Sequence, residues 1–325
     1  MGTLPRKGLT DIPGIRVGHA CDYEALTGCT VILCEGGAVA GGDVRGSASG
    51  TEEFSTLDPG HVTSRVHAVV LSGGSVFGLE AASGVRRYLE QKGVGFETGA
   101  AKVPIVPCAI LYDLSIGKAG VRPTREMGEA AAAAATAEAV KEGAVGAGTG
   151  ATVGKIFGMR QAMKSGIGSA TVALEGSYAG VLVAALAAVN AFGDVVDPAT
   201  GKIVAGARRS PASREFAGSA LALKRGARGG FRGQNTTLVV VATNAHLTKV
   251  EARKLAEQAQ LGVARAIRPV NTMYDGDLVI ALSLGEAQAD LNALGVAAAE
   301  AVAESILRAV RLAPSLGGVP GLAGP

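Results

Sequence analysis

The residues best suited to unusual chemistry lie at one junction, where a glycine-rich stretch leads directly into a strand that begins with threonine. Residues 225–235 read RGARGGFRGQN, and residues 236–243 read TTLVVVAT, which is rich in β-branched residues that favour strands. A deformable peptide bond before a hydroxyl residue is what a self-cleaving precursor needs. The Thr236 hydroxyl can attack the carbonyl of Asn235, and water can then hydrolyse the ester. The alternative interpretation is an ordinary loop that enters a strand.

Cleavage between Asn235 and Thr236 would leave Thr236 as the first residue of a new chain. A free α-amino group has a reference pKa of about 7.7–8.0, so near neutral pH it can accept the proton of its own residue's hydroxyl. One residue then supplies both nucleophile and base, and no histidine is required. The four histidines show no metal-ligand spacing, so neither a metal nor an organic cofactor is expected.

A second glycine-rich stretch, residues 146–155 (GAGTGATVGK), resembles a phosphate-binding loop without matching it. The pattern G-x-x-x-x-G-K-[ST] fails at both ends, because Thr149 takes the place of the first glycine and Ile156 follows Lys155. The loop can still place main-chain N–H groups and Lys155 beside an oxyanion.

Residues 73–78 (GGSVFG) place Ser75 in a strand–turn–helix setting that invites comparison with a nucleophile elbow. Phe77 stands where the second glycine of that motif is required. A tight turn between a strand and a helix is therefore the favoured interpretation.

Composition narrows the class of protein further. The 325 residues are 48% hydrophobic and carry a net charge of +3, which predicts a globular protein with a large core and argues against nucleic acid as a partner. The longest apolar run, residues 178–189, is too short to cross a membrane, and the first residues lack a signal peptide pattern. The cysteines show no paired spacing, which favours reduced thiols. We therefore expect a cytoplasmic protein with no membrane partner.

The elements that must position these residues follow from the hydrophobic pattern. Strands are expected over residues 30–34, 38–44, 67–72, 104–111, 169–174, 178–189, 236–243 and 278–284. Helices are expected over residues 76–91, 124–143, 213–224, 249–266 and 287–311. Many strands in antiparallel-looking pairs with a few helices favour a layered α+β sandwich over a doubly wound parallel sheet.

Several short stretches along the chain resemble, in the same order, the DmpA-like N-terminal nucleophile aminopeptidases, the family that also contains the nylon-oligomer hydrolase NylC. The stretches are residues 17–20 (VGHA), 27–31 (TGCTV), 71–79 (LSGGSVFGL), 148–155 (GTGATVGK), 189–190 (VN), 235–244 (NTTLVVVATN) and 273–277 (MYDGD). Each stretch alone is weak, but together they cover nearly the whole chain and are specific.

The resemblance implies an αββα four-layer sandwich of the DmpA and ornithine acetyltransferase type. It implies one self-processing domain, residues 1–325, cleaved into an α chain (1–235) and a β chain (236–325) that stay associated. The family also implies a homo-oligomer, which we expect to be a tetramer of αβ units.

The same resemblance assigns roles to individual residues. Thr236 resembles the nucleophile, and Asp275 and Asp277 resemble the acidic pair that orients and polarises it. Two carboxylates can hold a hydroxyl or an ammonium group in place.

Three further residues resemble the remainder of the site. Lys155 and Asn190 resemble the groups that line the nucleophile and the oxyanion position. Tyr112 resembles a tyrosine near the amine of the substrate.

The activity implied is hydrolysis of short peptides or peptide-like amides through a threonine acyl-enzyme. The threonine nucleophile and the Asp-x-Asp pair are closer to NylC, so an endo-acting hydrolase of 6-aminohexanoate oligomers is one alternative. Transfer of the acyl group to an amine acceptor is a second alternative, and an uncleaved structural homologue without activity is a third.

Overall fold

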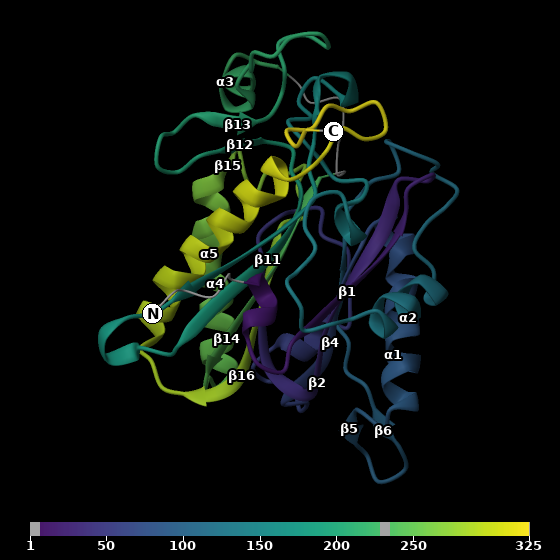
Figure 1. Ribbon diagram of the computed structural model, residues 1–325, viewed down its shortest axis with the longest axis vertical. Coiled ribbons are helices and arrows are strands. Elements are labelled where there is room, and N and C mark those ends of the chain that lie inside the picture. Colours follow the sequence, from purple (N-terminus) through teal and green to yellow (C-terminus); the bar gives the residue numbers. More distant parts are fainter. Residues whose placement is uncertain (1–6, 228–234, 325) are drawn as a thin grey trace.

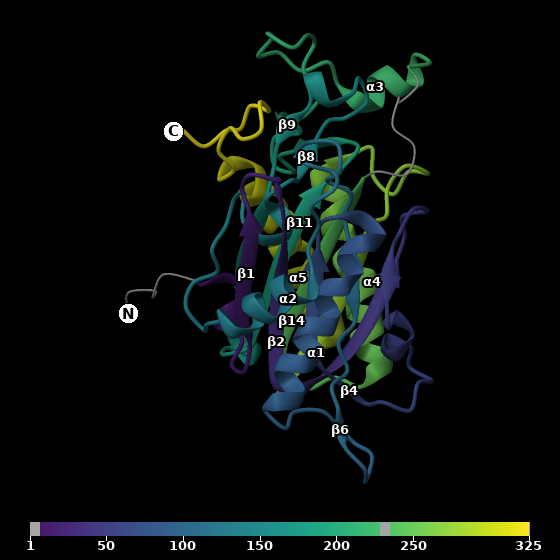
Figure 2. The same ribbon diagram turned by 90° about the vertical axis from the view of Figure 1, so that its right-hand side faces the viewer.

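The computed structural model describes residues 7–227 and 235–324. Residues 228–234, most of the glycine-rich stretch expected before the cleavage point, lie outside the described residues. Figures 1 and 2 show strands in the middle of the molecule with long helices on both sides. No helix in the described part of the chain is long and apolar enough to cross a bilayer.

One layer of strands contains the predicted cleavage point before Thr236. Its strands, in spatial order, are β10 (Ile167–Ala173), β11 (Leu182–Asn190), β14 (Thr236–Ala245) and β16 (Leu278–Ala287). β14 pairs antiparallel with β11 and parallel with β16. The outer face of this layer is covered by α4 (Lys249–Ala266) and α5 (Leu291–Arg311). The chain connection from β14 through α4 to β16 is thus a βαβ unit inside a mostly antiparallel sheet.

The other layer is built around β2 (Thr27–Val44), which also joins the two layers. Residues 39–44 of β2 pair with β16, whereas residues 29–33 pair with β4 (Arg65–Ser72). The rest of this layer consists of β1 (Arg16–Asp22) beside β2, then β7 (Cys108–Ile110) and β3 (Thr51–Glu52) beyond β4. Its outer face is covered by α1 (Ala81–Gln91) and α2 (Arg125–Ala133).

The alternation of side-chain directions along the strands explains why these layers stack. In β14, Leu238, Val240 and Ala242 belong to the core between the strand layers, whereas Val239 and Val241 pack against α4 and α5. Because successive side chains of a strand point to opposite faces, a strand apolar at every position must be covered on both faces. The layers therefore follow the order helix, strand, strand, helix, and the predicted αββα sandwich is confirmed.

The remaining short elements lie mostly around the ends of the two layers. They are β5 (Phe96–Glu97), β6 (Lys102–Val103), β8 (Thr152–Val153), β9 (Met163–Lys164), β12 (Asp194–Val196), β13 (Ile203–Ala205), β15 (Ile267–Arg268) and α3 (Ser219–Lys224).

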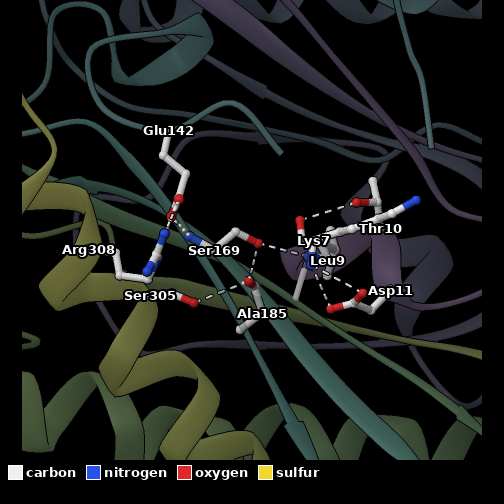
Figure 3. A network of polar contacts seen from close by, with 9 residues as sticks. All are labelled: Lys7, Leu9, Thr10, Asp11, Glu142, Ser169, Ala185, Ser305 and Arg308. Carbon is white, nitrogen blue, oxygen red and sulfur yellow. Dashed lines mark hydrogen bonds and ion pairs between the residues drawn. The ribbon is translucent and has the colours of Figure 1, made fainter. Parts of the chain in front are cut away.

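A polar network ties the start of the described chain to the first layer (Figure 3). The N–H of Leu9 donates to Ser169 Oγ at 2.8 Å, and Ser169 Oγ donates to the carbonyl of Ala185 in β11 at 2.7 Å. Glu142 accepts the N–H of Ser169 at 2.8 Å and forms an ion pair with Arg308 of α5. The network joins α5, β10 and β11, and thereby supports the strand that ends at the site described below.

Several expected elements differ from the structure. The helix expected to reach Gly143 ends at Ala133, because the chain then turns away to pair Thr136 with Val17 in an antiparallel bridge. The strands expected over residues 30–34 and 38–44 are both parts of β2, joined through an irregular register rather than separated. The helix expected over residues 213–224 begins only at Ser219. The strand expected over residues 104–111 is only Cys108–Ile110, and the helices expected from residues 76 and 287 begin at Ala81 and Leu291.

Two further expectations agree with the structure. α4 has the predicted bounds, and its capping box between Thr248 and Glu251 explains its sharp start. The expected pair of strands around residue 176 forms the antiparallel β10 and β11.

Candidate active site

The site lies where the last residue of one strand pairs with the first residue of its antiparallel neighbour. Thr236 is the first residue of β14 and pairs with Asn190, the last residue of β11. Both side chains are buried, Thr236 to 3% exposure and Asn190 to 1%. The pairing places a hydroxyl and an amide side by side on a rigid ladder, so little conformational entropy remains to be lost when they act together.

The peptide bond before Thr236 is held by two donors. The Thr236 hydroxyl donates to the carbonyl oxygen of Asn235 at 2.5 Å, and the N–H of Gly276 donates to the same oxygen at 2.7 Å. Donors that point at a carbonyl oxygen stabilise the negative charge that develops there when the carbonyl carbon is attacked. The arrangement can therefore support attack on this bond by the neighbouring hydroxyl.

Gly276 can make this contact only because it lacks a side chain. A Cβ at this position would lie 2.8 Å from Thr236 Oγ1 and 2.6 Å from the carbonyl oxygen of Ala48. The glycine between the two aspartates is thus a steric requirement of the site.

The two aspartates flank Gly276 and are both 1% exposed. Asp277 accepts the N–H of Thr237 at 2.6 Å and the N–H of Asn271 at 3.1 Å. Asp275 accepts the N–H of Phe192 at 3.1 Å and the hydroxyl of Thr272 at 2.5 Å. Asp277 therefore holds the residue after Thr236, whereas Asp275 joins the loop before β16 to the segment that follows β11.

Burial sets the protonation of this pair. Burial, together with the neighbouring charge of Asp275, raises the pKa of Asp277 to about 7. Burial also raises the pKa of Asp275, although hydrogen bonds from Thr272 and Phe192 oppose this shift. Two carboxylates this close cannot both ionise easily, so the pair can hold or release a proton near neutral pH.

Lys155 reaches Asn190 from the glycine-rich loop. Its Nζ donates to the carbonyl oxygen of Asn190 at 2.8 Å and to the side-chain Oδ1 of Asn190 at 2.7 Å. Burial lowers the pKa of Lys155 to about 7, opposed by the charge of Asp275 and, to a smaller extent, those of Asp113 and Asp277. A lysine with this pKa can give up its proton near neutral pH.

The amide of Asn190 is fully oriented by its neighbours. Its Oδ1 also accepts the N–H of Thr152 at 3.0 Å, and its Nδ2 donates to the main-chain carbonyl of Tyr112 at 2.8 Å. The structure thus brings the main chain of Tyr112 to the site. The oxyanion role of Asn190 stays a prediction, and sequence reasoning missed a second candidate donor, the N–H of Gly276, which contacts the carbonyl oxygen of Asn235.

All six residues predicted for the site lie in this one connected arrangement, and their individual roles stay predictions. Sequence reasoning missed Gly276, Thr272 and Asn271, which act through main-chain N–H groups or a local turn. The glycine between two aspartates was the one available signal. In the described part of the chain, no cluster of three or more histidine, cysteine, aspartate or glutamate side chains could hold a metal ion.

The raised pKa of Asp277 makes a testable prediction about stability. Because the pKa of Asp277 is higher in the folded chain than its reference value of about 3.9, folding favours the protonated form. Its contribution to stability is fully present below about pH 3.9 and is lost as the pH rises through about 7.

Asp277→Asn removes this loss, so the unfolding temperature of the variant should rise relative to the parent between about pH 4 and about pH 7. Both chains are measured in the Thr236→Ala background, which keeps them uncleaved. A difference that does not change with pH would contradict the raised pKa.

Solved structures share this architecture. An L-aminopeptidase D-Ala-esterase/amidase from Ochrobactrum anthropi, described as a variant of the Ntn hydrolase fold, matches with a TM-score of 0.71 and 19% identity, covering 97% of this chain and 88% of that chain. A β-aminopeptidase from Burkholderia sp. matches with a TM-score of 0.69 and 24% identity, covering 99% and 93%. The fold is therefore that of the Ntn hydrolases.

Sequence relatives narrow the class to a family. An uncharacterised aminopeptidase of Mycobacterium leprae (strain TN) is 39% identical over 97% of this chain and 93% of that protein. A 6-aminohexanoate-oligomer endohydrolase of Kocuria sp. (strain KY2) is 31% identical over 93% of this chain and 85% of that protein. Peptidase family S58 matches residues 7–323. The chain belongs to peptidase family S58 and is a hydrolase, which confirms the predicted DmpA-like family.

Proposed function

We propose that this chain is a self-processing N-terminal nucleophile amidohydrolase with Thr236 as its nucleophile. It cleaves its own Asn235–Thr236 bond, and residues 1–235 and 236–325 stay together as one domain. The observation that carries the proposal is the contact of the Thr236 hydroxyl with the Asn235 carbonyl oxygen, an oxygen that also accepts the N–H of Gly276.

Self-cleavage proceeds in two steps. Thr236 Oγ attacks the carbonyl carbon of Asn235, its proton passes to the leaving nitrogen of Thr236, and the C–N bond breaks to give an ester. Water then hydrolyses the ester, which frees the carboxylate of Asn235 and the amino group of Thr236. The N–H of Gly276 stabilises the oxyanion in both steps.

The mature site repeats this chemistry on another amide. The free amine of Thr236 takes the proton of its own hydroxyl, the hydroxyl attacks the substrate carbonyl, and the amine product leaves from an acyl-enzyme. Asp277 fixes the main chain of Thr237, and Lys155 fixes Asn190 opposite the nucleophile. Ordinary hydrolysis of the acyl-enzyme completes the cycle.

The substrate class follows from the relatives. Proteins named aminopeptidases support short peptides with a free amino end, and removal of the first residue is our first choice. The relatives named 6-aminohexanoate-oligomer endohydrolases support the second candidate, endo-acting hydrolysis of ω-amino acid oligomers. Transfer of the acyl group to an amine uses the same acyl-enzyme and stays an alternative outcome. Assembly into a tetramer of αβ units and a cytoplasmic location stay predictions.

Intact-mass spectrometry of the purified protein tests the processing step. We expect two masses that correspond to residues 1–235 and 236–325, and one mass for the whole chain would contradict the proposal. Aminoacyl anilides and 6-aminohexanoate oligomers then separate the two substrate candidates. An added amine acceptor measures how the acyl-enzyme partitions between water and the amine. A transferase would form the new amide in preference to the acid, whereas a hydrolase would release the acid.

A further inference from the structure

Lys164 is a buried lysine that the proposed mechanism does not use. It is 0% exposed, and its Nζ donates to the carbonyl oxygens of Ser165 at 2.6 Å, Ala151 at 2.8 Å and Gly148 at 3.1 Å. An ammonium group has three donors, so this cage satisfies all of them. A buried charge is costly unless every donor is paired, so the cage accounts for a lysine at this depth.

Two of the three acceptors belong to the glycine-rich loop, residues 146–155. Lys164 binds Gly148 and Ala151 on this loop and pairs with Thr152 in the short β8–β9 ladder. The next contacts along the loop are those of the site, since Thr152 and Lys155 both donate to Oδ1 of Asn190. A single residue, Thr152, therefore connects Lys164 to Asn190, the residue that lies opposite Thr236.

Asp113 packs against the same loop from another side. It is 4% exposed and accepts the hydroxyl of Thr27 and the N–H of Gly74, each at 2.7 Å. A Cβ on Gly150 would lie 2.6 Å from Asp113 Cβ, and a Cβ on Gly73 would lie 2.1 Å from Asp113 Oδ2. The glycine-rich loop and the turn at residues 73–78 thus both pack against this one carboxylate.

We propose that Lys164 is a positioning residue that fixes the glycine-rich loop, against which Asp113 packs, and so places Lys155 and Asn190 opposite Thr236. The inference rests on the proposed function for its kinetic consequence. Its structural part, the loop held by the Lys164 cage, can be measured without any reaction.

Charge gives Lys164 a second effect on Lys155. Among the described residues, the charged groups that act on Lys155 are Asp275, Asp113, Asp277 and Lys164. Of these four, Lys164 is the one that carries a positive charge when protonated, and burial lowers its own pKa to about 7. A like charge disfavours the protonated form of Lys155, so the loss of Lys164 raises the pKa of Lys155. A loss of packing that leaves Lys155 in place would not move this pKa.

Lys164→Met tests the inference, and Lys249→Met is the matched control. Lys249 Nζ also donates to main-chain carbonyls, those of Thr56 and Thr63 at 2.9 Å, but it lies at the start of α4, outside the site. Self-cleavage is followed by intact mass from the time of synthesis, so the chain is its own substrate. We expect Lys164→Met to slow cleavage about 100-fold, as expected for a small misplacement of reacting groups, and Lys249→Met to leave the rate unchanged.

The pH profile separates positioning from general damage. The midpoint of the rate against pH should move to higher pH in Lys164→Met and stay in place in Lys164→Arg, which keeps the charge. An unchanged cleavage rate in Lys164→Met, an unchanged midpoint, or equal slowing in Lys249→Met would each overturn the inference. Should Lys164→Met fail to fold, Lys164→Gln is judged by the same criteria.

Hydrogen exchange distinguishes failure of this inference from failure of the proposed function. In the uncleaved Thr236→Ala chain, Lys164→Met should increase exchange across residues 146–155, and Lys249→Met should not. Unchanged exchange in this loop overturns the inference even if the wild-type chain cleaves itself. A wild-type chain that never cleaves refutes the proposed function, and with it the kinetic part of the inference.

Discussion

Thr236→Ala yields one uncleaved chain without amidase activity, because the substitution removes the only atom proposed to form the acyl bond. The proposed oxyanion donor, the N–H of Gly276, remains in place, so the loss measures the nucleophile itself. We expect a fall of at least about 10³-fold in the rate of self-cleavage, in line with the loss of other covalent nucleophiles. Thr236→Ser keeps a hydroxyl and should cleave, although its extra rotamer freedom can slow the reaction. Intact mass at fixed times after synthesis gives both rates.

A threonine at the far end of the same strand provides the control. Thr243 is also buried, and its hydroxyl donates to the carbonyl of Leu182 at 2.8 Å. Thr243→Val loses that hydrogen bond without approaching the site, so it should be less stable but still cleave before residue 236. Fragments with the expected masses from Thr236→Ala would discard the proposed nucleophile.

Gly276→Ala is the second substitution expected to have a large effect, and its cause is steric. The new Cβ would lie 2.8 Å from Thr236 Oγ1 and 2.6 Å from the carbonyl oxygen of Ala48, closer than real Cβ contacts. Ala48 also donates its N–H to the carbonyl of Asp275 at 2.8 Å, so the loop cannot simply move away. The nucleophile or the Gly276 N–H must therefore shift, and either shift should slow self-cleavage by about 10²-fold or more.

Gly120→Ala is the matched control, because a Cβ at Gly120 would meet nothing within 4 Å. It should cleave at the rate of the unmodified chain. Near-normal cleavage by Gly276→Ala would show that the tight packing around the Thr236 hydroxyl does not matter, and it would remove the Gly276 N–H from the proposed oxyanion site.

Several features of this protein could be predicted from local sequence patterns and short motifs: two of its main elements, its family and its candidate site residues. Local patterns predicted the strand that starts at Thr236 and the bounds of α4. The short motifs together predicted the family and the αββα sandwich, both confirmed. They also selected Thr236, Asp275, Asp277, Lys155 and Asn190 before any geometry was known, because hydroxyl, carboxylate, amine and amide groups are recognisable as residue types.

The contacts between these groups depend on tertiary packing and could not be predicted from the sequence. The Gly276 N–H reaches Asn235 because the two segments form a parallel bridge, and no periodicity in the sequence encodes that register. Asn190 is oriented by the carbonyl of Tyr112, 78 residues away, and Asp113 binds Thr27 across 86 residues. Main-chain donors and acceptors look alike in every residue, so only the packing of the strand layers determines which of them point into the site.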